Sequence, residues 1–149
     1  MTIPEMLAKW KSVNLEREVP NIIQSSSDEM VKLNRSQLYQ KGVDSENERL
    51  KPYQSPAYAL DKNRINPLPG LFNPDLYLTG AFQRGFYAQV KAGKSIIFGS
   101  TDFKSDRLER DYGKEIFGLT KDNRKVYLDT TVMPLIREYI TRQTGLRFT

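Results

Sequence analysis

The sequence of 149 residues contains no cysteine and no histidine. The missing cysteine excludes disulfide bonds and thiol nucleophiles, and the two absences together exclude zinc sites of the Cys/His type and an imidazole base. Long apolar runs are also lacking, since 38% of the residues are hydrophobic and 28% are charged. We therefore expect neither a membrane-spanning segment nor a signal peptide. The length fits one domain with its own core.

Runs of basic residues are absent too, although the chain is basic as a whole. It has 23 Lys and Arg residues against 18 Asp and Glu residues, which gives a net charge of +5 and a pI of about 9.4. The two signs are interleaved along the whole length, as in DSENERLK and KSDRLERDYGKE. This pattern favours a mixed, solvated surface over a patch that follows the phosphates of a nucleic acid.

Helical signals occupy the N-terminal third of the sequence. Pro4 precedes a short stretch, residues 5–12, whose apolar side chains fall on one side of a helix. Pro20 is expected to separate this helix from the next one. From Asn21 onward apolar residues recur at spacings of three and four, which predicts a long amphipathic helix that ends at Gly42.

The segment between residues 42 and 77 differs in character from its flanks. It holds five prolines and shows neither helical nor strand periodicity. Tyr53, Tyr58, Leu68 and Phe72 nevertheless give it apolar anchors that a free linker lacks. We expect an extended arm over residues 44–74 that wraps over its own domain or over a neighbouring subunit, is mobile in the isolated chain and drives assembly.

A β-hairpin is predicted after this segment. The runs AFQRGFYAQV (81–90) and SIIFGS (95–100) are rich in strand-forming residues and flank the polar tip KAGK. Gly93 supplies the positive φ that a tight turn needs. The loss of alternation near Gly85 indicates a β-bulge.

The remaining sequence is helical in pattern. One helix is expected over residues 103–112 and another from Thr120, as N-cap, to Gly145, with Pro134 kinking or dividing it. The chain is therefore predicted to be a single α+β domain over residues 1–149. Its parts are a long N-terminal helix, a small antiparallel sheet with a central β-hairpin, and a C-terminal helix packed on that sheet.

Two partial motifs do not meet the requirements of a ligand site. Residues 93–95 (GKS) resemble the end of a phosphate-binding loop, but Ala88 stands where glycine is needed and the triplet precedes a strand. The carboxylates of residues 44–48 alternate as calcium ligands do, but Arg49 stands where that loop requires glycine. No residue spacing points to catalysis either, so we expect no cofactor, no metal and no enzyme activity.

One stretch resembles a known family. Residues 75–82 (DLYLTGAF) resemble the L-T-G-x-[LF] signature of phage tail-completion, or neck, proteins. In that family a long helix precedes the signature, and a β-hairpin and a C-terminal helix follow it, as expected here. Residues 37–53 and 99–120 resemble the corresponding parts of versions from Bacteroides phages, including crAss-like phages. Ala81 departs from the commoner family pattern, which has arginine at that position.

The resemblance implies a structural virion protein, a ring-forming adaptor in the phage neck or tail that joins the portal or connector to the tail. Its partners would be itself in a closed ring of roughly six or twelve copies, the portal, connector and tail proteins, and DNA passing non-specifically through the channel. No membrane is implied. The protein would reside in the virion, and in the host cytoplasm during assembly. The candidate interface residues are Tyr53, Tyr58, Leu68, Phe72, Thr79, Gly80, Arg84, Lys91 and Lys94.

A second class of function is open on the residues alone, namely a small basic nucleic-acid-binding domain that uses the hairpin as a stacking platform. The platform would comprise Arg84, Phe86, Tyr87, Lys91, Lys94 and Phe98. Because a small sheet needs its aromatic side chains for its own core, we favour a core role for these rings.

Overall fold

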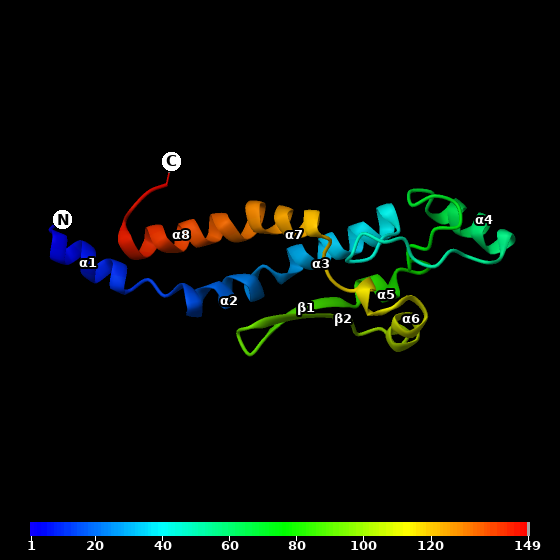
Figure 1. Cartoon of the computed structure of the whole chain (residues 1–149), viewed down its shortest axis with the longest axis horizontal. Coiled ribbons are helices and arrows are strands. Elements are labelled where there is room, and N and C mark those ends of the chain that lie inside the picture. The colour runs from blue at the N-terminus through cyan, green and yellow to red at the C-terminus, as the bar shows by residue number, and fades with distance from the viewer. Residues whose placement is uncertain (149) are drawn as a thin grey trace.

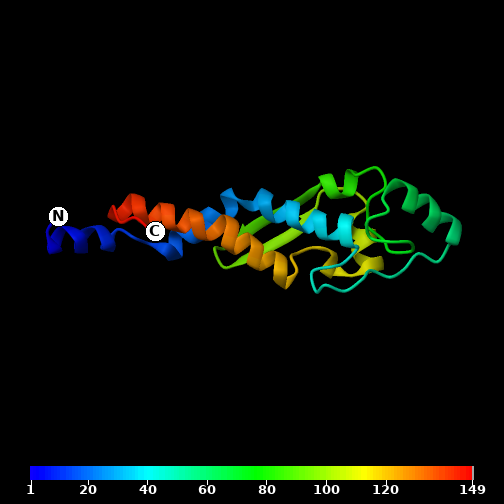
Figure 2. The same cartoon turned by 90° about the horizontal axis from the view of Figure 1, so that it is seen from above.

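Helices from the two ends of the chain run side by side along an elongated molecule (Figure 1, Figure 2). The computed structural model describes residues 1–148. Helices α1 (Ile3–Lys11) and α2 (Leu15–Ser25) lie along α8 (Met133–Thr144), and α3 (Ser27–Ser36) lies beside α7 (Lys121–Tyr127). Helices α2 and α3 are thereby placed between the C-terminal helices and the strands, while α1 projects beyond the end of α8 (Figure 1).

The sheet is one antiparallel hairpin, β1 (Phe86–Lys91) and β2 (Ser95–Ser100), packed against α2 and α3. Its register runs from Phe86 opposite Ser100 to Lys91 opposite Ser95. Burial alternates along β1, because every second side chain faces the helices. The predicted α+β class, with an antiparallel hairpin and a C-terminal helix, is confirmed.

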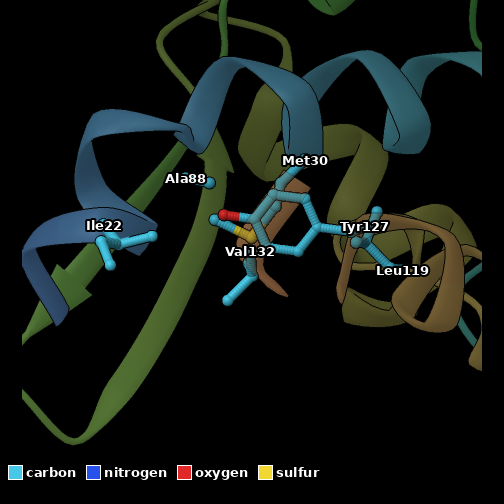
Figure 3. Packing of buried hydrophobic residues seen from close by; sticks show 6 residues of the cluster. All are labelled: Ile22, Met30, Ala88, Leu119, Tyr127 and Val132. Atoms are coloured by element: carbon cyan, nitrogen blue, oxygen red, sulfur yellow. The ribbon is translucent and has the colours of Figure 1, made fainter. Parts of the chain in front are cut away.

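One hydrophobic cluster joins the sheet to both sets of helices (Figure 3). Its buried members are Ile22, Met30, Ala88, Leu119, Tyr127 and Val132. The Tyr127 ring lies at its centre, and the Tyr127 hydroxyl is 2.7 Å from that of Ser26. Leu135 and Ile136 of α8 pack against the same cluster as Phe98 of β2. The C-terminal helices therefore share a core with the sheet.

A second cluster lies toward the other end of the molecule and consists of Leu38, Leu50, Phe82, Phe86 and Ile116. Two buried amides connect it to the backbone of the segment before α7. Asn34 donates to the Ile116 carbonyl at 3.0 Å and accepts from the Gly118 N–H at 3.1 Å. Gln37 in the same way donates to Gly118 and accepts from Thr120. These hydrogen bonds pair backbone N–H and C=O groups of a buried loop that is not part of a sheet.

The long N-terminal helix is divided in the structure, so its predicted continuity from Asn21 to Gly42 is wrong. Ser26 interrupts it between α2 and α3, because its backbone angles, φ −108° and ψ 17°, lie outside the helical range. The Ser26 hydroxyl donates to the Ile22 carbonyl at 2.7 Å. The last turn is a π-helix, Gln37–Lys41, that ends as predicted at Gly42 with φ 62°. Pro20 lies inside α2 and does not separate two helices.

The first part of the predicted hairpin is also different. Residues 81–84 form a helical turn, α5 (Ala81–Arg84), and β1 begins only at Phe86, so the bulge predicted near Gly85 is absent from the hairpin. The Phe82 and Phe86 rings lie 4.9 Å apart, edge to face. Residues four positions apart meet in this way on a helical turn, whereas in a strand they would lie far apart along one face.

The segment 44–74 is not an extended arm throughout, because it contains helix α4 (Pro56–Ile65). The Ser55 hydroxyl caps this helix by accepting from the Tyr58 N–H, and Pro56 occupies its first turn. Leu50 and Ala59 are buried in the same chain. The segment therefore wraps over its own domain, which was one of the two expected alternatives.

The C-terminal predictions are confirmed. Helix α6 (Ser105–Tyr112) is followed by a short 3₁₀ turn, Lys114–Ile116, and Thr120 caps α7 by accepting from the Asn123 N–H. A π-helical turn, Leu128–Val132, separates α7 from α8 immediately before Pro134. Of the helices within residues 1–148, none has the length and apolar character that crossing a membrane requires.

Candidate interaction surfaces

The nine candidate interface residues lie in three different places. Tyr53, Tyr58, Leu68 and Phe72 belong to the α4 end of the molecule. Thr79 and Gly80 lie in the loop that enters α5, and Arg84 is the last residue of that helix. Lys91 and Lys94 lie at the turn of the hairpin, which Figures 1 and 2 place away from α4 along the long axis.

Four tyrosines line a hollow of about 340 Å³ between α4 and α6. We call it the tyrosine hollow; its aromatic lining comes from Tyr53, Tyr58, Tyr77 and Tyr112, together with Phe82. The Tyr53 and Tyr58 rings meet edge to face with centroids 5.1 Å apart. Lys104 and Arg107 place two cations on its wall, and Asp111 places one carboxylate there. This combination suits an apolar or aromatic side chain with an anionic neighbour.

Two phenols of the tyrosine hollow, those of Tyr53 and Tyr112, have raised pKa values. Burial raises the pKa of Tyr53, and the negative charge of Asp75 acts in the same direction. Burial also raises the pKa of Tyr112. Both hydroxyls are therefore neutral at physiological pH and can donate or accept a hydrogen bond.

A buried ion pair supports the floor of the hollow. Lys62 Nζ lies 2.9 Å from Asp75 Oδ1, with side chains 6% and 2% exposed. Lys62 also donates to the Tyr77 carbonyl. Asp75 accepts from the Asn66 amide at 2.8 Å and from the Tyr77 N–H at 2.9 Å. The network ties α4 to the residues before α5, so Tyr58 and Tyr77 are held on a rigid base.

Thr79, Gly80 and Arg84 act mainly within their own loop. Arg84 folds back and donates to the Thr79 carbonyl at 3.0 Å. Gly80 has φ 85°, and a Cβ there would lie 2.7 Å from the Arg84 guanidinium and 2.9 Å from the Tyr77 ring. The glycine of the signature is thus required by local packing and backbone conformation.

The hairpin presents one aromatic ring to solvent. Phe86 is buried and Phe98 packs against the first cluster, so the preferred core role of these two rings is confirmed. Tyr87 is 40% exposed, and its ring covers Gly99 of β2. A row of stacked rings on the hairpin, which the nucleic-acid alternative needs, does not form.

A further apolar surface lies at the N-terminal end and was not among the candidate residues. Helix α1 has no buried residue, although it carries four large apolar side chains. These side chains are between 40% and 73% exposed and belong to Ile3, Met6, Leu7 and Trp10. The helix is ordered by a capping box in which Thr2 and Glu5 bond each other's backbone. Its amphipathic pattern was visible in the sequence, but that pattern does not distinguish a buried face from an exposed one.

Among residues 1–148 no group of three or more acidic side chains is arranged to hold a metal ion. No family model, no curated protein and no solved structure matches the chain.

Proposed function

We propose that this chain is a structural virion protein, a ring-forming adaptor in the phage neck or tail that joins the portal or connector to the tail. The resemblance of residues 75–82, 37–53 and 99–120 to phage tail-completion proteins supports this function. The proposal includes location in the virion, assembly from the host cytoplasm, and passage of DNA through the ring.

The observation that carries the proposal is the exposed apolar side of α1. An isolated protein gains nothing from ordering four large apolar side chains in water, whereas burying them in an assembly stabilises it. The tyrosine hollow lies near α4, at the end of the long axis opposite α1 (Figure 1). A ring requires two different surfaces on each subunit that meet head to tail. The two ends of this molecule provide such a pair of surfaces.

The test is the mass of the purified chain, alone and mixed with the portal protein of the same phage. Sedimentation velocity and negative-stain microscopy should reveal rings, with portal or by themselves at high concentration. The variant Leu7→Ala/Trp10→Ala should assemble poorly while its far-ultraviolet circular dichroism and unfolding midpoint stay near those of the parent, because no residue of α1 belongs to the buried core of the single chain.

A matched control is Lys32→Ala/Arg110→Ala, which removes two exposed side chains from other faces and should leave assembly unchanged. A chain that stays monomeric in the presence of portal, or that assembles equally well without Leu7 and Trp10, contradicts the proposal. Sub-micromolar, sequence-selective DNA binding near physiological salt would instead favour the nucleic-acid-binding class.

A further inference from the structure

Strand β2 has a free edge. Within residues 1–148 the sheet has two strands, so β2 pairs on one side only. The N–H of Val90 in β1 points away from β2, since it donates to the Gln24 side chain at 2.8 Å. In an antiparallel pair, two residues that lie directly opposite each other point their backbone N–H and C=O groups either both toward the partner strand or both away from it. Ile96, opposite Val90, and Phe98, two residues on, therefore direct their backbone N–H and C=O groups away from β1. A further strand can pair with this row.

The free edge of β1 does not offer the same opportunity. Gln24 of α2 already occupies the Val90 N–H, and α2 and α3 pack along this strand. Pairing between hairpins of two copies must therefore join β2 to β2. Ile96 and Ile97 are each 38% exposed, so the strand that would be covered also carries apolar side chains in need of burial.

A groove of about 500 Å³ follows the free edge of β2 toward α6. We call it the acidic groove, because its charged lining consists of four carboxylates and one ammonium: Glu46, Asp106, Glu109, Glu115 and Lys114. The opposite end of the hairpin is basic, with exposed Lys91 and Lys94 at the turn. One hairpin thus carries opposite charges at its base and at its tip.

We propose that β2 pairs antiparallel with β2 of a second copy of this chain, about a two-fold axis at Ile97, to form a four-stranded sheet. In this register Ile96 faces Phe98 of the second copy, so the two free rows of backbone groups meet. Lys94 then faces Ser100 of the second copy, which lines the acidic groove. The two-fold axis makes each of these contacts twice. The pairing does not depend on the function proposed above.

The absence of cysteine makes a single-cysteine test direct. In the proposed register the two copies of residue 97 form a non-hydrogen-bonded pair with Cα atoms about 4.5 Å apart, within reach of a disulfide. Ile97→Cys should therefore give a covalent dimer under mild oxidation. Gln89→Cys is the matched control on the same face of β1. Its two copies would be three strand spacings apart, about 14 Å, and should not link.

Non-reducing electrophoresis should show about tenfold more covalent dimer for Ile97→Cys than for Gln89→Cys. The two variants should have equal circular dichroism spectra, which shows that both are folded. Equal linking of the two variants, or none for Ile97→Cys at millimolar protein, overturns the pairing. In that case the free edge of β2 would be available to a strand of another protein and not to a second copy of this chain.

The charge contacts give an independent readout by sedimentation equilibrium. Lys94→Glu should raise the dimer dissociation constant about tenfold, because two charge contacts turn repulsive, and added Glu109→Lys should restore it. Lys32→Glu in α3 changes the net charge equally at an exposed position and should leave the constant unchanged. An equal effect of Lys32→Glu and Lys94→Glu overturns the proposed register.

Discussion

At the scale of single residues, the Lys62–Asp75 pair is the strongest constraint on the proline-rich segment. Both side chains are buried and fully hydrogen-bonded, so removing one partner leaves the other charge without compensation. Lys62→Met should lower the free energy of unfolding by about 3–5 kcal/mol, measured by urea denaturation. Lys62→Met/Asp75→Leu should lose less than the sum of the two single changes.

The control for this pair is Lys32→Met, which removes an exposed ion pair with Glu29 at 3.1 Å and should cost less than about 1 kcal/mol. A loss for Lys62→Met as small as that of Lys32→Met would mean that the segment 44–74 is not held to the folded chain. The mobile arm expected from the sequence would then be correct after all.

The buried tyrosines predict how stability changes at alkaline pH. Burial raises the pKa of Tyr53 in the folded state, while in the unfolded chain Tyr53 titrates near the ordinary tyrosine pKa of 10.0. Above pH 10 the unfolded state therefore releases a proton that the folded state keeps, and stability falls as pH rises. Tyr53→Phe should lose less stability than the parent between about pH 8 and pH 11 in thermal melts. Equal losses in the two proteins would contradict this assignment.

At the scale of elements, the hairpin turn holds the non-glycine residue Ala92 in a strained backbone conformation with positive φ, and a substitution can relieve this strain. Ala92 and Gly93 have φ of 54° and 65°, and the Lys94 N–H donates to the Lys91 carbonyl at 3.1 Å. Two positive φ values are typical of a type I′ turn, which prefers Asn-Gly. Ala92→Asn should raise the free energy of unfolding by about 0.5–1 kcal/mol, and Gly93→Ala should lower it by about 1 kcal/mol. Chemical denaturation of both variants checks the sign of each change.

Element ends were predictable where a local rule acts alone. Two helices end as expected at Gly42 and Gly145, and another begins as expected at Thr120. These ends were predictable because a positive φ or a capping hydroxyl is a property of a few neighbouring residues. Helix α4 was missed although Ser55 and Pro56 mark its start, since its apolar residues do not fall on one face. The break at Ser26 is a change of backbone angles at one polar residue, which hydrophobic periodicity does not reveal.

The candidate site was predictable only in part. The aromatic residues of the segment 44–74 were identified, but their meeting with Tyr77 and Tyr112 depends on how α4 packs against α6. The acidic groove combines the loop of residues 45–46 with α6 and β2, which are far apart in sequence. Helix α1 shows the reverse case: its amphipathic pattern was clear, but whether its apolar side is covered depends on the neighbouring elements and not on α1 itself.

At the scale of the whole molecule, stability should be graded along the long axis. Both hydrophobic clusters contain residues of α3, β1 or the 116–120 segment, while α1 has no buried residue. Ser12, the C-cap of α1, donates from its hydroxyl to the Gln143 side chain of α8 at 3.0 Å. Amide hydrogens exchange through local opening, which is easiest where few apolar contacts hold an element. In hydrogen-exchange mass spectrometry of the isolated chain, α1 should exchange fastest among the helices and α3 and β1 slowest. Assembly should slow α1 selectively, because only a partner can cover its apolar side. Protection of α1 equal to that of α3 in a chain shown to be monomeric would contradict this gradient and with it the role of α1 as an assembly surface.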